Sequence, residues 1–147
     1  MEEGEIADVC IIGSGPGGCA AALRLAKLRV DVVLLDKAVF PRDKVCGDAL
    51  SGKVMRSLER LDPALADALR KHAALEPSWG VTFTAPSGKG LRVPFSRETG
   101  IGDAPGAILP RMDFDNFMLD AVKRAGQARI LEGVQAKIFE RTRNGWS

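Results

Sequence analysis

Histidine, cysteine and aromatic residues are scarce in this chain of 147 residues, which has one histidine, three cysteines and 5% aromatic residues. A zinc site takes most of its ligands from cysteine and histidine, so no metal site is expected. A Ser-His-Asp or Cys-His hydrolase is also excluded, because the single histidine, His72, is expected at an exposed helix end. Cys10, Cys19 and Cys46 fall in a predicted strand, a predicted helix and a polar loop, so they form no disulfide framework.

The sequence also lacks a strong charge bias and a long apolar run. Its net charge is +2, and its few aromatic residues are not interleaved with basic ones, so no nucleic-acid partner is expected. No apolar run approaches the length of a membrane span, and the acidic residues 1–5 do not resemble a signal peptide. A cytoplasmic protein is therefore predicted. The length suits one compact domain and is short for an enzyme of two domains.

Residues 8–36 are the most informative stretch. The apolar run Val9–Ile12 predicts a parallel strand that is buried on both faces. A G-x-G-x-x-G motif follows at once, and its glycines have separate roles. Gly13 permits a tight exit from the strand, Gly15 lets a pyrophosphate approach the backbone, and Gly18 lets a helix pack close to the sheet.

A helix is predicted to begin near Pro16 and to direct its free N–H groups at the phosphates. Asp36 ends the next strand, where an acid accepts hydrogen bonds from a ribose. The alternative is a structural turn followed by a polar strand end. Arg29 joins helix to strand where a glycine is usual, so a strained turn is predicted there. The motif predicts a dinucleotide site at Gly13, Ser14, Gly15, Pro16, Gly17 and Gly18.

The chain then departs from a simple repeat of strand and helix. Residues 37–50 predict an ordered polar loop, Ser51 is expected to cap one helix, and Asp62 with Pro63 begins a second helix. Alternating apolar residues at 81–85 and 91–95 predict a β-hairpin.

The last third of the chain is predicted to return to the parallel sheet. A loop is expected at 96–106, and a helix starts at Arg111 with Asp113 or Asp115 as its cap. Strands are predicted at 129–133 and 135–141.

Three segments together resemble the N-terminal part of the geranylgeranyl reductase family of FAD-dependent oxidoreductases, within the class built like para-hydroxybenzoate hydroxylase. They are residues 13–18 with Asp36, residues 40–51 with the pattern P-x-x-K-x-C-G-D, and residues 111–115 with the pattern R-x-x-F-D. The resemblance covers nearly the whole chain. The family usually has glutamate where this chain has Asp36.

The resemblance implies an α/β fold with a Rossmann-like FAD/NAD(P)-binding parallel sheet and an inserted antiparallel β-hairpin. The expected division is an FAD-binding segment at 1–75, an antiparallel substrate-domain segment at 76–109 and a second FAD-binding segment at 110–147. Family members are much longer, so the chain is expected to be a truncated part whose FAD site is incomplete.

The resemblance also implies cofactor contacts. Cys46, Gly47 and Ala49 would line the flavin, Arg111 would pair with FAD, and the backbone near Ala136 would meet the adenine end. A solvated loop is an equal alternative for Arg42 and Lys44, and an inert thiol is the alternative for Cys46. Beyond the glycine turn, the predicted cofactor-binding residues are Asp36, Lys37, Arg42, Lys44, Cys46, Gly47, Ala49, Arg111 and Ala136.

The function implied is an FAD-dependent oxidoreductase that reduces carbon–carbon double bonds of an isoprenoid, with NAD(P)H as one candidate electron donor. A flavin-dependent monooxygenase or halogenase is an alternative, and a non-catalytic nucleotide-binding fragment is another. The expected partner is a small-molecule or lipid-like substrate, which would allow peripheral membrane contact. The residues identify no catalytic acid or base and no oligomeric state.

Overall fold

The computed structural model describes residues 6–95, 104–143, 145 and 146, and it divides into two compact units. Unit 1 comprises residues 1–43 and 114–147, and unit 2 comprises residues 44–113. Unit 2 therefore includes two helices that the sequence predicts for the first FAD-binding segment. The predicted domain boundaries at 75 and 109 remain a prediction.

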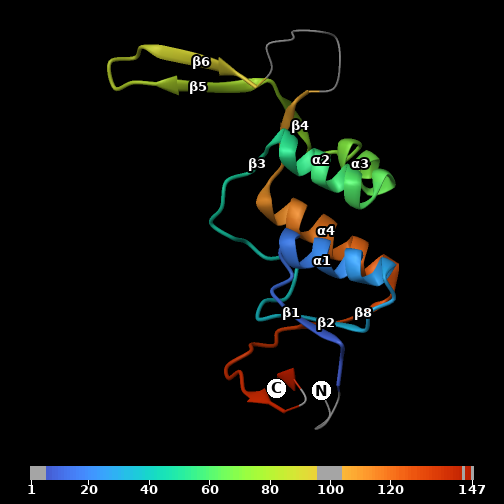
Figure 1. Cartoon of the computed structure of the whole chain (residues 1–147). Helices are drawn as coiled ribbons and strands as arrows, with labels where there is room; N and C mark the ends of the chain where they lie inside the picture. Colours follow the sequence, from blue (N-terminus) through green and yellow to red (C-terminus); the bar gives the residue numbers. More distant parts are fainter. Residues whose placement is uncertain (1–5, 96–103, 144, 147) are drawn as a thin grey trace. The chain divides into compact units, whose positions relative to one another are not determined.

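Unit 1 is built on a parallel sheet of three strands, β1 (Val9–Ile12), β2 (Val32–Asp36) and β8 (Ala128–Glu132), in the order β1-β2-β8. Helix α1 (Pro16–Lys27) connects β1 to β2, and α4 (Arg111–Ala125) precedes β8. Both helices lie over the same face of this sheet (Figure 1). This is the expected result of two right-handed crossovers in one direction. The predicted Rossmann-like parallel sheet is confirmed.

The core of unit 1 centres on β2, which is buried at every position because it is the middle strand. The prediction that β1 is buried on both faces is wrong. Cys10 and Ile12 are exposed, whereas the alternate residues Val9 and Ile11 are half-buried. β1 is an edge strand, and α1 packs on one of its faces. Edge strands with a single covered face show this alternation.

Helix α1 buries its small residues Cys19, Ala22 and Ala26 and ends without glycine. Arg29 follows with φ of 58°, in the left-handed region that non-glycine residues seldom occupy. The predicted strained turn between α1 and β2 is therefore confirmed.

In unit 2, the helices α2 (Gly52–Leu61) and α3 (Pro63–Arg70) follow one another directly. Asp62 caps α3, because its Oδ1 accepts hydrogen bonds from the first backbone N–H groups of that helix. Ser51 is the N-cap residue of α2, as predicted, but its side chain makes no capping hydrogen bond. None of the helices in the described ranges is long and apolar enough to cross a membrane.

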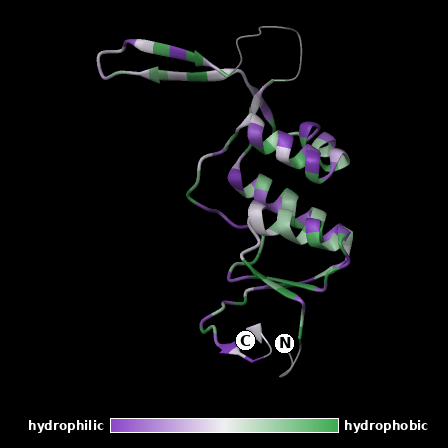
Figure 2. Ribbon diagram, in the orientation of Figure 1, coloured by the Kyte–Doolittle hydropathy of each residue, from purple (hydrophilic) through white to green (hydrophobic). Residues whose placement is uncertain are grey.

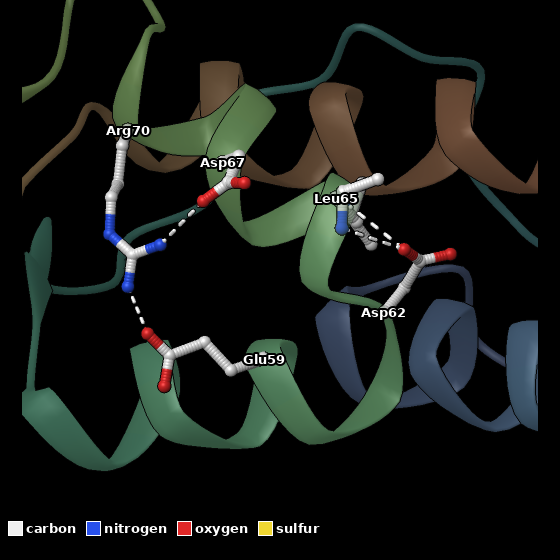
Figure 3. Close-up of polar contacts among 6 residues, drawn as sticks. Glu59, Asp62, Leu65, Asp67 and Arg70 are labelled. Atoms are coloured by element: carbon white, nitrogen blue, oxygen red, sulfur yellow. Dashed lines mark hydrogen bonds and ion pairs between the residues drawn. The ribbon is translucent and has the colours of Figure 1, made fainter.

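Arg70 ties these two helices together (Figure 3). Its Nη1 donates to Asp67 of the same helix at 2.9 Å, and its Nη2 donates to Glu59 of α2. A planar guanidinium can serve two carboxylates at once, which fixes how the helices meet.

The strands of unit 2 form two antiparallel sheets. β3 (Ala49–Leu50), β7 (Gly106–Ile108) and β4 (Glu76–Ser78) pair in the order β3-β7-β4. β5 (Gly80–Thr84) and β6 (Gly90–Pro94) form a separate hairpin, as the alternation predicted.

One face of the β5–β6 hairpin is apolar. Val81 lies opposite Val93 and Phe83 lies opposite Leu91, and directly opposed residues share a face. All four side chains are exposed, Phe83 at 63% and Leu91 at 65%. Figure 2 shows the resulting alternation of hydrophobic and hydrophilic residues along the hairpin.

The end of the chain differs from the prediction. Residues 135–141 were expected to form a strand, but among the described residues after β8 the strands are the short antiparallel pair β9 (Arg141–Thr142) and β10 (Gly145–Trp146). Ile138 and Phe139 are exposed, and within the described ranges no strand pairs with this stretch. Alternating apolar residues form a strand only where a neighbouring strand accepts their backbone bonds. Of the predicted loop at 96–106, residues 96–103 lie outside the described residues.

Candidate cofactor site

The glycine turn has the geometry that the motif predicts. Gly13 has φ of +104°, which only glycine adopts readily, as it leaves β1. A Cβ on Gly18 would lie 1.9 Å from the carbonyl oxygen of Gly13, so no larger residue fits between helix and strand. A Cβ on Gly15 would meet only Arg42, at 3.8 Å from Nη2. The backbone at Gly15 is therefore open to a ligand.

The start of α1 suits an anion. Pro16 is its first residue, and its first turn contains no acid. A Cβ at Gly17 would have nothing within 4 Å. The free N–H groups and the positive end of the helix dipole favour a phosphate at such a helix end.

Asp36 connects the glycine turn to the end of β2 through side-chain hydrogen bonds. Its Oδ2 accepts a hydrogen bond from the backbone N–H of Ser14 at 2.7 Å, and its Oδ1 accepts one from Ala38 at 2.9 Å. The N–H of Gly13 donates to the carbonyl of Leu35 at 2.7 Å. Each carboxylate oxygen keeps a further lone pair, so the predicted contact with a ribose remains open to Asp36.

The segment after β8 lies against the end of β2. Val134 donates its N–H to the carbonyl of Asp36 at 2.9 Å, and Gly133 donates to Ala38 at 3.2 Å. Ala136 is half-buried in this segment, and Lys37 is exposed. The adenine-end contact of Ala136 and the cofactor contact of Lys37 remain predictions.

Arg42 is not a solvated loop residue. Its side chain is 17% exposed, its Nη2 lies 3.0 Å from Oδ2 of the fully buried Asp115, and its guanidinium stacks 4.8 Å from the centroid of the Phe40 ring. The backbone N–H of Phe40 donates in turn to Oε1 of Glu132 at 2.8 Å. Lys44, by contrast, is exposed.

Asp113 or Asp115 was expected to cap α4. Asp113 lies in the first turn of the helix, and the prediction for Asp115 is wrong. It lies inside the helix as the buried partner of Arg42. The sequence showed Arg42 and Asp115 in two separate motifs, without a signal that pairs them.

The pKa of the Cys19 thiol is raised to about 12, chiefly by burial and also by the negative charges of Asp115 and Asp36, against the opposing effect of Arg42. The thiol donates a hydrogen bond to the carbonyl of Ser14 at 3.1 Å. Cys19 is therefore a protonated packing residue of the turn and not a nucleophile.

Unit 2 gathers the residues predicted to lie by the flavin. Nη1 of Arg111 donates to Sγ of Cys46 at 3.1 Å, although the two residues are far apart in sequence. The backbone N–H of Arg111 donates to Oδ1 of Asp48 at 2.8 Å, so Asp48 serves the start of α4. A Cβ on Gly47 would have nothing within 4 Å, and Ala49 begins β3 with its side chain exposed. Asp48 thus accepts a hydrogen bond at the start of α4, a contact that the sequence did not reveal.

Comparison with known proteins decides the family. Residues 6–147 match the family model of the FAD binding domain. This chain belongs to the FAD-binding domain family. The match confirms the predicted cofactor, FAD.

Two relatives are named as reductases, and one of them supports the resemblance to geranylgeranyl reductases. A menaquinone reductase of Mycobacterium tuberculosis is 33% identical over 138 residues, which are 92% of this chain and 31% of the relative. A digeranylgeranylglycerophospholipid reductase of Methanothrix thermoacetophila is 32% identical over 130 residues, 88% of this chain and 30% of the relative. The FAD-binding domain thus spans about a third of the length of these relatives.

Solved structures share the fold. A flavoprotein/dehydrogenase from Cytophaga hutchinsonii has 26% identity and a TM-score of 0.77, and the match covers 92% of this chain and 32% of that chain. A myxobacterial chondrochloren halogenase that depends on FAD has 26% identity and a TM-score of 0.74, over 88% of this chain and 29% of that chain.

The residues of this FAD-binding domain fit the phosphate end of FAD. Oγ of Ser14 and Nη1 of Arg42 are buried and have no hydrogen-bond partner within the described ranges. Ser14 precedes Gly15 in the chain, and Nη2 of the same Arg42 guanidinium lies 3.8 Å from the Cβ position of Gly15, where the backbone is open. FAD would be held there through its pyrophosphate, with Asp36 at the neighbouring strand end.

Proposed function

We propose that the protein is an FAD-dependent oxidoreductase that reduces carbon–carbon double bonds in an isoprenoid substrate. The contact between Arg111 and Cys46 carries this proposal. It brings together the P-x-x-K-x-C-G-D and R-x-x-F-D segments, two of the three segments on which the likeness to geranylgeranyl reductases rests. The two relatives are also named as reductases, and the name of one contains geranylgeranyl groups.

In this scheme the protein's own residues bind and orient FAD. FAD, when bound, supplies the transfer of a hydride. The glycine turn and Arg42 would take the pyrophosphate, and Cys46, Gly47, Ala49 and Arg111 would contact the flavin part. Saturating one double bond takes two electrons and two protons, so an external donor is required, and NAD(P)H is our candidate.

Cofactor binding is tested with Gly15→Val. The larger side chain would occupy the space that the pyrophosphate needs, so we expect FAD affinity to fall by at least about a hundredfold. The fold should persist, since only Arg42 lies within 4 Å of the added Cβ. Gly90→Val in the exposed strand β6 is the matched control. Tight FAD binding by Gly15→Val, measured by flavin fluorescence, would contradict this placement.

Substrate chemistry is tested by anaerobic incubation with FAD, NAD(P)H and a lipid that carries geranylgeranyl chains. Mass spectrometry should show the gain of two hydrogens for each double bond reduced. Menaquinone in a parallel reaction tests the quinone as the alternative substrate that one relative's name suggests.

The second candidate is a flavin-dependent halogenase or monooxygenase, favoured by the structural likeness to the chondrochloren halogenase. Such chemistry requires oxygen. A hydroxylated or halogenated product that forms only in air, with no reduced product under anaerobic conditions, would contradict the reductase proposal.

A lipid-like substrate leads us to propose peripheral membrane contact as well. The exposed apolar face of the β5–β6 hairpin supports this, with Phe83 and Leu91 as its most exposed members. In a flotation assay with lipid vesicles we expect Phe83→Ser to reduce binding. Equal flotation of the unsubstituted protein and Phe83→Ser would contradict a role for the hairpin in membrane contact.

A further inference from the structure

A buried acid stands close to the glycine turn, where a negative charge would oppose a bound phosphate. The side chain of Asp115 is 0% exposed, and its Oδ2 lies 3.0 Å from Nη2 of Arg42. A buried carboxylate is tolerated when a cation neutralises it. The guanidinium of Arg42 supplies that cation.

Arg42 is fixed from two directions. Asp115 holds its Nη2, and the ring of Phe40 covers the guanidinium at 4.8 Å from the ring centroid. A guanidinium is a rigid planar fork, so fixing one nitrogen and one face also fixes the direction of the other nitrogen. The remaining nitrogen, Nη1, is therefore pre-organised.

Nη1 is buried and has no hydrogen-bond partner within the described ranges. Leaving such a donor unpaired is unfavourable, so buried donors normally have partners. Nη2 of the same group lies 3.8 Å from the Cβ position of Gly15, at the open part of the turn. Ser14, the neighbour of Gly15, also has a buried Oγ without a partner there. Two unpaired polar groups next to one glycine indicate a ligand rich in oxygen.

We propose that Asp115 is a positioning residue for pyrophosphate binding. It holds the guanidinium of Arg42 so that Nη1 donates to an oxygen of the pyrophosphate at Gly15. Asp115 itself does not touch the ligand. The inference concerns the cofactor alone and holds whichever substrate the enzyme reduces.

The test compares two ligands, ADP, which carries a pyrophosphate, and adenosine, which carries no phosphate. Their affinities are measured by calorimetry for the unsubstituted protein, Asp115→Asn, Arg42→Gln and the double variant. We expect Asp115→Asn to weaken ADP about tenfold, the effect of losing one charge-assisted hydrogen bond, and to leave adenosine unchanged. The double variant should bind ADP no more weakly than Arg42→Gln, because both substitutions act through the guanidinium of Arg42.

Matched variants complete the design. Asp120→Asn changes an acid of the same helix whose partner is Asn116, and it should leave ADP binding unchanged. Asp115→Glu keeps the charge and should restore part of the ADP affinity. An equal loss of ADP and adenosine affinity in Asp115→Asn would overturn the proposal, and so would independent, multiplying effects of the two substitutions.

If Asp115→Asn does not fold, Arg42→Met is compared with Arg42→Met/Asp115→Asn, in which both charges are removed. The proposal requires that the double variant binds ADP no more weakly than Arg42→Met, and weaker binding would overturn it. Failure of the unsubstituted protein to bind ADP would contradict the cofactor placement together with this inference. Normal ADP binding by Asp115→Asn would contradict the role of Asp115 alone.

Discussion

Strand β2 of unit 1 and the β5–β6 hairpin of unit 2 both contain apolar residues, yet they bury them to opposite extents. Every position of β2 is buried, whereas every position of β6 is exposed. The middle strand has a paired strand on each side and helix α1 against it, while β5 and β6 form a sheet of two strands. Burial here depends on what covers a strand more than on its composition. A pair of strands alone is marginally stable in water.

The comparison is tested most strongly by one pair of substitutions. Leu34→Ala removes a fully buried side chain from β2, and we expect the free energy of unfolding to fall by about 2–5 kcal/mol. Leu91→Ala in β6 removes a side chain that is 65% exposed, and the expected change is below about 0.5 kcal/mol. Urea denaturation measures both. Equal losses would mean that the hairpin is covered in solution.

The glycine turn gives the next effect in size. Gly18→Ala places a Cβ 1.9 Å from a backbone oxygen, so helix α1 must shift, and we expect a loss of about 1–3 kcal/mol or more. Gly17→Ala is the matched control for stability, since its Cβ would have nothing within 4 Å. An unchanged denaturation midpoint for Gly18→Ala would show that α1 is not held close to β1.

The strained turn after α1 predicts a smaller gain. Arg29→Gly should stabilise the protein by about 0.5 kcal/mol, because glycine adopts φ of 58° without strain but loses more freedom on folding. Lys27→Gly, at the last helical position of α1, should instead destabilise by up to about 1 kcal/mol. Thermal unfolding of both variants decides whether the strain resides at Arg29.

Glu132 gives the smallest expected effect, a dependence on pH. Burial raises the pKa of Glu132, but the hydrogen bond from the N–H of Phe40 and the ammonium of Lys123 outweigh it and lower the pKa below its ordinary value of 4.5. The ionised Glu132 therefore contributes to the free energy of unfolding in full above pH 4.5. This contribution is lost as the pH falls through the lowered pKa of the folded state. Glu132→Gln should therefore flatten the loss of stability below pH 4.5. Glu76→Gln, at an exposed strand position, should leave the profile unchanged.

Much of unit 1 could be predicted because its local signals agree with each other. The glycine spacing, the small residues of α1 and the apolar run of β2 all point to one strand-helix-strand unit, and Arg29 was predicted to be strained. The β5–β6 hairpin could be predicted equally well, because its apolar and polar residues alternate with the period of a strand.

Other features depend on contacts that a sequence does not show. The exposure of one face of β1 follows from its place at the sheet edge. Residues 135–140 form no strand because no strand in the described part of the chain pairs with them. The pairing of Arg42 with Asp115 joins two distant motifs, and so does that of Arg111 with Cys46. Side chains in two separate segments give no signal of whether they meet, since that depends on how the chain folds back.

The three cysteines make the glycine turn observable without any added label. Cys10 and Cys46 are exposed, and Cys19 is buried with its thiol bonded to Ser14. A thiol reagent therefore modifies two cysteines at once, and it modifies the third only when α1 lifts from the sheet. The rate of this slow phase measures how often the turn opens, and a dinucleotide that occupies the turn should lower that rate further.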